Sequence, residues 1–514
     1  MHTKKLILRV SILLAFAVTP LFAFGQTCEQ SCEQRCSKEV TQSKINELCQ
    51  SVFKEWNLPG MSIVVIKDGK VVFLEGYGKS TYKPAGEDIT PDTQFVIAST
   101  SKAFTSALLA IVMDSAPVKW SDTVVKHLPD FRLYDSWVTS NFLVRDIMVH
   151  KTGFNAYAAD DLPHFGYNRD EIYKLLRHIQ PSHSFRTTYA YNNVLYTVSA
   201  KIIEKYTGMS WDDAIVKNIF APLQMNSSTT GSRAYLSSPT LAKGHRHYKD
   251  GDSIKFALRE DTQNAYRWLS AIAPAGFVIS TARDMGNWLK MHLEGGVFNG
   301  TQIISKENHA YLFTPQTISG WDSTTVNNYV QGWTIEQSSS GRLIRHTGLA
   351  YGYTALVGMV PELKMGFAIL INAGNTTNPH MAIARELIEM YRGKDEKNWR
   401  EHYLFQFMKT PARGATNEVK DSLSPKRYEL YTGSYYKEDF GDVVISMKEG
   451  KLFFALKDAK GELRHKSGDI FNVNIAGAGN IEVEFSPGIN IPIESLTFKI
   501  GDPIGKFYKR ENLR

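Results

Sequence analysis

Residues Phe95 to Asp114, FVIASTSKAFTSALLAIVMD, hold the pattern that decides the fold. A short β-type run passes directly into a long apolar segment that is predicted to be a buried helix. Ser99 and Lys102 lie at this junction, three residues apart, and would share one face of the helix start. The free N–H groups and partial positive charge of a helix start favour negative charge on a serine oxygen. A lysine buried beside it is driven towards its neutral form, so the junction predicts an activated nucleophile.

The spacing of these two residues is not decisive by itself. The pairs Ser51/Lys54 and Ser80/Lys83 repeat it, one inside a predicted amphipathic helix and one in a polar loop. On the spacing alone, a structural interpretation is as good as a catalytic one. Ser99 differs from the other two serines because an apolar strand-like run meets an apolar helix at its position.

A second candidate lies in FRTTYAYNNVLYTVSAKIIEKYTG, where Tyr191 and Asn193 precede a predicted helix. A tyrosine ordinarily keeps its proton until about pH 10, and two neighbouring cations would lower that pKa. The Asn193 amide could orient the lysine or a substrate. Taken alone, the pair also suits a core tyrosine beside a helix-capping asparagine.

A third candidate is GRLIRHTGLAYGY, in which His346, Thr347 and Gly348 end a predicted strand. Glycine at such a position permits close approach of another backbone or of a ligand. A histidine on a strand edge has no special meaning in isolation. The order of the three candidates along the chain gives them their meaning.

Ser-x-x-Lys, then Tyr-x-Asn, then His-Thr-Gly resembles the serine β-lactamase and penicillin-binding protein superfamily. The resemblance is nearest to its class C-like branch of β-lactamase-related serine hydrolases, esterases and D-amino-acid peptidases. It covers about residues 43–395, including LVRDIMVHKTGF and PAGFVISTARDMGNWL. It implies an α+β fold, with an antiparallel sheet flanked by terminal helices plus a helical lobe. Residues 425–514 alternate with period two, which predicts a small all-β barrel, and they resemble the lipocalin-like domain often appended to such hydrolases.

The resemblance also implies a mechanism. Ser99 would attack a carbonyl to form an acyl-enzyme, and Lys102 and Tyr191 would act as general base and acid. Asn193 would position the substrate and the lysine. Without a metal or organic cofactor, the protein would cleave an ester, amide, peptide or β-lactam bond in a small-molecule or peptide substrate.

The third motif would form the side of the site that contacts the substrate. His346 and Thr347 would contact the substrate, and the oxyanion would lie between the N–H groups of Ser99 and of Leu349, which follows Gly348. His346 would titrate near neutral pH. It replaces the lysine of true β-lactamases, which favours an esterase or peptidase over an efficient β-lactamase. The segment Lys151-Thr152-Gly153 copies the β-lactamase motif but precedes Tyr191, so it is assigned a structural role.

The N-terminus predicts export. Three basic residues precede an uncharged apolar run, residues 10–25, which is too short to span a bilayer comfortably and ends in Ala23-Phe24-Gly25. A cleaved signal peptide, residues 1–25, is favoured over a retained anchor. A periplasmic or secreted protein with no transmembrane segment after cleavage is therefore expected.

All four cysteines follow this segment closely. Export permits disulfides, and an even number suits two of them: Cys28, Cys32, Cys36 and Cys49. A soft metal could also bind the first three on one helix face, but no histidine accompanies them.

The composition and net charge of the chain bear on the other classes of function. The formal charge of +7 over 514 residues is modest, and basic residues alternate with acids, which argues against nucleic-acid binding. A homo-oligomer is compatible with the sequence. Two other functions are kept open: a penicillin-binding-like sensor of cell-wall fragments with little turnover, and a purely structural envelope protein. The predicted segments are 1–25 (signal), 26–42 (cysteine-rich), 43–395 (hydrolase), 396–424 (linker) and 425–514 (barrel).

Overall fold

The computed structural model describes residues 40–510, except 83–85, 251–252, 375–377, 395–396, 410–426, 489–491, 501 and 504. The predicted signal peptide and Cys28, Cys32 and Cys36 lie outside the described residues.

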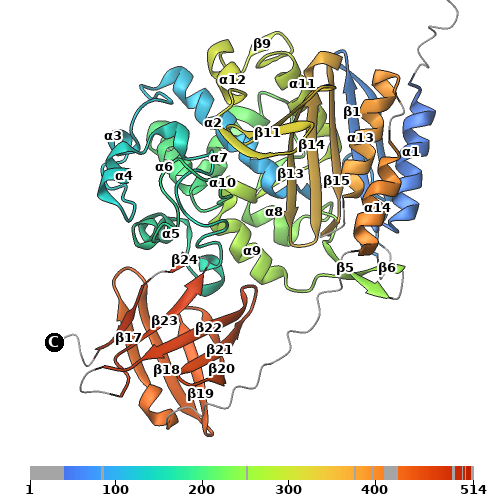
Figure 1. Cartoon of the computed structure of the whole chain (residues 1–514). Helices are drawn as coiled ribbons and strands as arrows, with labels where there is room; N and C mark the ends of the chain where they lie inside the picture. The colour runs from blue at the N-terminus through green and yellow to red at the C-terminus, as the bar shows by residue number, and fades with distance from the viewer. Residues whose placement is uncertain are drawn as a thin grey trace, which may run out of the picture. The chain divides into compact units, whose positions relative to one another are not determined.

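An eight-stranded antiparallel sheet joins the two ends of the hydrolase segment (Figure 1). Strands β1 (Gly60–Lys67) and β2 (Lys70–Gly78) form a hairpin, and its two turn residues, Asp68 and Gly69, have φ of 50° and 74°. Strand β1 then pairs with β15, which comes from the far end of the segment. The other strands follow in the order β14, β13, β12, β11, β10, and their bounds are Met365–Ile371 (β15), Tyr353–Val360 (β14), Gly341–Ala350 (β13), Thr334–Ser338 (β12), Thr325–Tyr329 (β11) and Thr317–Trp321 (β10).

Helices cover both faces of this sheet. Helix α1 (Gln42–Glu55) packs on α13 (Pro379–Arg392), and the two lie on one face. Helix α11 (Ala282–Leu293) packs on β1 and β15. Helix α14 (Trp399–Lys409) packs on α13, within the segment assigned to the linker. The predicted α+β class, with terminal helices on the sheet, is confirmed.

A helical lobe stands beside the sheet, and its centre is α2 (Ser101–Ser115). This helix is buried over most of its surface, as its all-round apolar sequence predicts. It packs on α6, α7, α10 and α12. The lobe helices are α3 (Val124–His127), α4 (Ser136–Asn141), α5 (Arg169–Leu175), α6 (Tyr196–Thr207), α7 (Trp211–Ile215), α8 (Ser232–Ser237), α9 (Thr262–Ala271), α10 (Ala273–Gly276) and α12 (Lys306–Leu312).

Short strands connect the sheet and the lobe. They pair in three small groups: β3 (Phe95–Val96), β7 (Val278–Ser280) and β4 (Thr229–Thr230); β16 (Ala373–Gly374), β5 (His245–Asp250) and β6 (Ser253–Leu258); β8 (Val297–Phe298) and β9 (Thr301–Gln302). The first group positions the segment that leads into α2, because Phe95 pairs with Ser280.

The C-terminal strands close into an eight-stranded barrel, because β22 pairs with β23 and β25 pairs with β17. Aromatic rings fill its interior; those of Tyr431 and Phe485, for example, lie 4.9 Å apart. The predicted barrel is confirmed. Its strands are β17 (Gly433–Lys437), β18 (Gly441–Lys448), β19 (Lys451–Leu456), β20 (Ala459–Ser467), β21 (Ile470–Ile475), β22 (Gly479–Ser486), β23 (Ser495–Ile500) and β25 (Phe507–Lys509), and β24 (Asp502–Pro503) pairs with β23 outside the ring.

One residue of the lobe is built into the barrel core. Phe165 is fully buried, with its ring centroid 5.6 Å from that of Phe498 and 6.4 Å from that of Phe454. Its carbonyl accepts a hydrogen bond from the Asp458 N–H at 3.1 Å. Nearby, the Tyr167 hydroxyl donates to the carbonyl of Phe440 at 2.7 Å. The segment around Phe165 therefore belongs to both packed cores.

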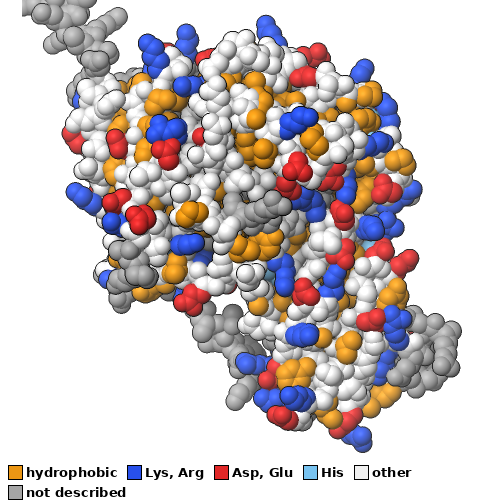
Figure 2. Space-filling view, turned by 180° about the vertical axis from the view of Figure 1, so that it is seen from behind, with side chains coloured by type: hydrophobic (Ala, Val, Ile, Leu, Met, Phe, Trp, Pro, Cys, Tyr) orange, Lys and Arg blue, Asp and Glu red, His pale blue; other side chains and the backbone are white. Residues whose placement is uncertain are grey.

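Basic and acidic side chains are interspersed over the face of the molecule shown in Figure 2. That face carries no continuous basic stripe of the kind that binds nucleic acid. Within the described residues, every helix falls short of the length and apolar character needed to cross a bilayer.

Candidate active site

Ser99 lies in a tight turn between a short strand and the central helix of the lobe. The sequence predicts a helical position, but the serine occupies a 3₁₀ turn (Ala98–Thr100) just before α2 begins at Ser101. Ala98 has φ of 48°, a left-handed conformation that is costly for alanine. The buried Ser101 hydroxyl holds the turn by donating to the Ala98 carbonyl at 2.6 Å and accepting from the Val278 N–H at 3.0 Å.

Lys102 lies one turn beyond the serine and is fully buried. Its Nζ is 3.3 Å from Ser99 Oγ, 2.6 Å from Asn193 Oδ1 and 2.9 Å from the Ala275 carbonyl oxygen. Burial lowers the pKa of Lys102 to about 7, and the negative charge of Asp160 partly opposes this effect. A neutral amine has two N–H groups and one lone pair. The two carbonyl oxygens take the N–H groups, which leaves the lone pair for the serine hydroxyl.

Tyr191 is a second side chain, after Lys102, that lies beside Ser99. Its hydroxyl hydrogen-bonds with Ser99, and the Lys102 Nζ lies 4.6 Å from the centre of its ring. Burial raises the pKa of Tyr191 well above its ordinary value. The sequence-based expectation of a lowered pKa is therefore wrong, because desolvation of the phenolate outweighs the lowering effect of the hydrogen bond with Ser99. The phenol keeps its proton and can serve as a hydrogen donor.

His346 lies on β13 with both ring nitrogens engaged. Nδ1 donates to the Thr347 carbonyl at 2.7 Å, and Nε2 accepts from the Tyr329 hydroxyl at 2.9 Å. Burial, followed by the charge of Lys102, lowers the pKa of His346 to about 3. The prediction that this histidine titrates near neutral pH is wrong. A neutral imidazole stands where true β-lactamases have a permanent cation.

Gly348 brings β13 against the turn that carries the nucleophile. A Cβ on Gly348 would lie 2.2 Å from the Ile97 carbonyl oxygen and 3.1 Å from the Ala98 Cβ, so only glycine fits without a shift. Thr347 is half-buried on the same strand, and Leu349 is 54% exposed. The structure thus brings the third motif to the serine, and the oxyanion role of the Ser99 and Leu349 N–H groups stays a prediction.

Asp160 is a site residue that the sequence reasoning missed. Two adjacent aspartates, Asp160 and Asp161, predict a solvated loop pair from the sequence alone, but Asp160 is only 8% exposed. Asn193 Nδ2 donates to Asp160 Oδ2 at 2.5 Å, so the carboxylate reaches Lys102 through the amide. Burial raises the pKa of Asp160 to about 7. No local motif marks this position, because its partner Asn193 is distant in the chain.

The remaining predicted residues lie outside this network. The Lys151 carbonyl accepts from the Arg186 N–H at 2.8 Å, and the Gly153 carbonyl accepts from the Ser182 N–H at 2.9 Å. These contacts agree with the structural role assigned to that segment. Cys49 is a free, buried thiol in α1, and burial raises its pKa to about 12. Its candidate partners Cys28, Cys32 and Cys36 lie outside the described residues, so the disulfides stay a prediction.

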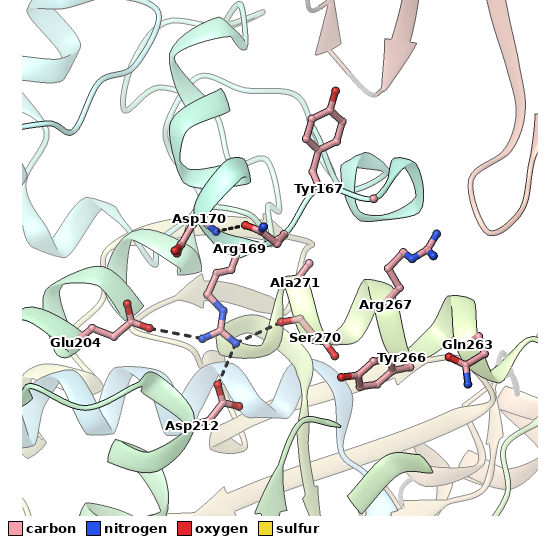
Figure 3. Close-up of a pocket in the computed structure, with 12 residues that line it drawn as sticks. Tyr167, Arg169, Asp170, Glu204, Asp212, Gln263, Tyr266, Arg267, Ser270 and Ala271 are labelled. Carbon is pink, nitrogen blue, oxygen red and sulfur yellow. Dashed lines mark hydrogen bonds and ion pairs between the residues drawn. The ribbon is translucent and has the colours of Figure 1, made fainter. Parts of the chain in front are cut away.

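A cavity of about 540 Å³ opens elsewhere in the lobe (Figure 3). At its wall, Arg169 forms ion pairs with Asp212 at 3.2 Å and Glu204 at 3.8 Å, and it donates to the Ser270 carbonyl at 3.3 Å. None of the side chains that surround Ser99 lines this cavity. The volume would suit a ligand, but the terminal nitrogens of Arg169 are already paired with protein groups, and the cavity lies apart from the Ser99 nucleophile.

Residues 45–389 match the profile of the family described as Beta-lactamase. The chain belongs to this family. Residues 417–505 match a second family, described as a domain of unknown function, DUF3471. The family places the Ser99 constellation in a fold of serine hydrolases and penicillin-binding proteins.

Curated relatives include hydrolases and penicillin-binding proteins. The chain is 27% identical over 440 residues to "Unguisins hydrolase ungD'" of Aspergillus campestris, which covers 80% of this chain and 79% of that protein. It is 25% identical over 345 residues to Penicillin-binding protein 4 of Amycolatopsis lactamdurans, covering 65% and 86% of the two chains.

Two solved structures share the fold. The octameric penicillin-binding protein homologue from Pyrococcus abyssi aligns with a TM-score of 0.58 at 21% identity, over 91% of this chain and 98% of that one. The D-amino acid amidase from Ochrobactrum anthropi SV3 aligns with a TM-score of 0.55 at 20% identity, over 68% of this chain and 98% of that one.

Proposed function

We propose that the protein is an exported serine hydrolase that cleaves an ester, amide or peptide bond through an acyl-enzyme on Ser99. The observation that carries the proposal is a buried Lys102 whose Nζ lies 3.3 Å from Ser99 Oγ and whose pKa is lowered to about 7. A lysine in that state accepts a proton at neutral pH, which an ordinary surface lysine does not.

In the proposed acylation, neutral Lys102 takes the Ser99 proton as Oγ bonds to the substrate carbonyl carbon. The π electrons move to the carbonyl oxygen, which the N–H groups of Ser99 and Leu349 would stabilise. The tetrahedral intermediate then collapses and the bond to the leaving group breaks. The leaving group takes the Tyr191 phenol proton, which the Lys102 ammonium replaces.

Deacylation repeats these steps with water. Lys102, neutral again, removes a proton from a water molecule as the water oxygen bonds to the acyl carbon. The bond from this carbon to Ser99 Oγ breaks, and Oγ recovers a proton from the lysine. The acid product leaves and the resting site is restored.

Two observations support an amide or ester substrate over a penicillin. The neutral His346 offers no permanent positive charge for a substrate carboxylate. One relative is named as a hydrolase of unguisins, and one structural neighbour as an amidase of D-amino acids. We therefore favour an esterase or a D-amino-acid peptidase over an efficient β-lactamase.

The first experiment is covalent labelling. A fluorophosphonate should add once to the wild-type protein, on Ser99 by peptide mass spectrometry, and not to Ser99→Ala. A panel of p-nitrophenyl esters, nitrocefin and D-amino-acid p-nitroanilides should show faster turnover of esters or D-anilides than of nitrocefin. Equal labelling of Ser99→Ala would refute the nucleophile. A stable acyl adduct without release would instead support a penicillin-binding-like sensor.

Export and domain organisation are part of the same proposal. The mature protein should begin near residue 26, in a periplasmic or secreted fraction, as N-terminal sequencing of the purified protein would show. The hydrolase domain is proposed to span 43–395 and the barrel domain 425–514, joined by a linker at 396–424. An intact, unprocessed N-terminus in the cytoplasmic fraction would contradict the proposed export.

A further inference from the structure

We propose that Asp160 is a positioning residue of the catalytic centre, which fixes the Asn193 amide and sets the charge of Lys102. The inference rests on the proposed function. It extends the Ser-x-x-Lys and Tyr-x-Asn motifs by a buried carboxylate that neither motif contains.

The orientation of the Asn193 amide supports the first part of the proposal, which is the positioning of that side chain by Asp160. An asparagine side chain can present its oxygen or its nitrogen to a given neighbour, because the two ends have the same shape. Here the Lys102 N–H needs an oxygen, and the Asp160 carboxylate, in its ionised form, can accept only from the amide nitrogen. The carboxylate therefore selects the orientation in which Asn193 Oδ1 faces the lysine.

The loop that carries Asp160 is held by the fold. The Tyr157 N–H donates to the Tyr191 carbonyl at 2.7 Å, and Asn192 Nδ2 donates to the Ala158 carbonyl at 3.1 Å. Trp268 Nε1 donates to the Asp160 carbonyl at 2.7 Å. Tyr157 and Ala159 have φ of 61° and 63°, so the backbone on both sides of Ala158 is strained, and this persists only where surrounding contacts determine it.

The charge of Asp160 supports the second part of the proposal, which is its effect on Lys102. Asp160 Oδ1 is buried and has no hydrogen-bond partner among the described residues, so its carboxylate acts on the site mainly through Asn193 and through its field. A carboxylate near a lysine stabilises the ammonium, and removing it lowers the pKa of the lysine. The other titratable groups that act on the pair are Tyr191, Tyr196, His150 and His346 around Lys102, and Tyr157 and Asp161 around Asp160.

Two substitutions at Asp160 separate its positioning of Asn193 from its effect on the charge of Lys102. Asp160→Asn keeps an oxygen that can accept from Asn193 but removes the charge, so the acid limb of the kcat/KM profile should move to lower pH by about one unit. Asp160→Leu also removes the acceptor and leaves Asn193 Nδ2 buried and unpaired, which should lower kcat/KM by about tenfold to a hundredfold. The matched control is Asp130→Asn, because Asp130 is an exposed lobe carboxylate that accepts from the Tyr173 hydroxyl.

The outcomes distinguish this inference from the proposed function. A wild type that forms no adduct at Ser99 and turns over no substrate would overturn the proposed function. A wild type that is active, with Asp160→Asn folded by circular dichroism and an acid limb unchanged from wild type, would overturn the role of Asp160 alone. If Asp160→Leu does not fold, the pH profile of Asp160→Asn still decides.

Discussion

The chemistry of Lys102 is set by burial and not by its position in a motif. The same residue spacing occurs at Ser51/Lys54 in α1, where Lys54 is exposed. At Lys102, full burial lowers the pKa and two carbonyl oxygens fix the direction of the amine. The functional property of the motif therefore comes from the residues packed around it.

This lowered pKa predicts the pH dependence of acylation. The neutral fraction of Lys102 grows as the pH rises through about 7, so kcat/KM should increase about tenfold per pH unit below that value and level off above it. Stopped-flow acylation with a p-nitrophenyl ester measures this profile. Lys102→Met should abolish the rise together with the activity, and a flat wild-type profile from about pH 5 to 9 would contradict the assignment of the base.

Some site residues could be predicted from the sequence and others could not. Ser99, Lys102 and Asn193 each belong to a motif, and the structure places Lys102 within hydrogen-bonding distance of the other two. Asp160 belongs to none, and the neutral state of His346 depends on its burial in the assembled fold. Local pattern identifies residue types, whereas desolvation is a property of the assembled fold.

At the scale of elements, the contact between β13 and the Ser99 turn determines the shape of the site. The strand approaches the turn so closely at Gly348 that no side chain fits there. The hairpin of β1 and β2 and the long helix α2 could be predicted from alternating residues, turn signals and an apolar run. The 3₁₀ turn at Ser99 could not, because the left-handed Ala98 is stabilised by Ser101 and by the distant Val278.

A methyl group at Gly348 tests this contact. Gly348→Ala should force β13 away from Ile97 and lower the acylation rate by about a hundredfold or more, the usual effect of losing an oxyanion donor. The control is Gly320→Ala on β10, where an added Cβ meets nothing within 4 Å. Single-turnover kinetics measure the effect, and equal rates for the two variants would show that the strand does not set the site.

At the scale of the whole molecule, the segment from Asp160 to Tyr167 links the catalytic centre to the C-terminal barrel. Asp160 contacts Asn193 at one end, and Phe165 is packed among barrel residues at the other. The sequence predicts a separate barrel domain, but it gives no sign that a lobe phenylalanine completes the barrel core. Burial of a single side chain between two domains leaves no periodic pattern.

Phe165 should therefore matter for stability. Phe165→Ala should lower the free energy of unfolding by about 3–5 kcal/mol, since it empties a site lined by aromatic rings. Ile318→Ala on β10 is the control, because Ile318 is 57% exposed and its loss should cost about 0.5 kcal/mol or less. Urea denaturation followed by tryptophan fluorescence compares the two, and similar midpoints would contradict the packing.

The position of Phe165 also has a consequence for biosynthesis. Its partners Phe454 and Phe498 leave the ribosome long after the loop itself has emerged, because both lie near the end of the chain. Until those strands are made, Phe165 lacks its aromatic partners Phe454 and Phe498. A nascent chain therefore completes the packing around Phe165 only after the barrel strands have been synthesised, and a product truncated before residue 425 would carry Ser99 but lack these contacts of Phe165.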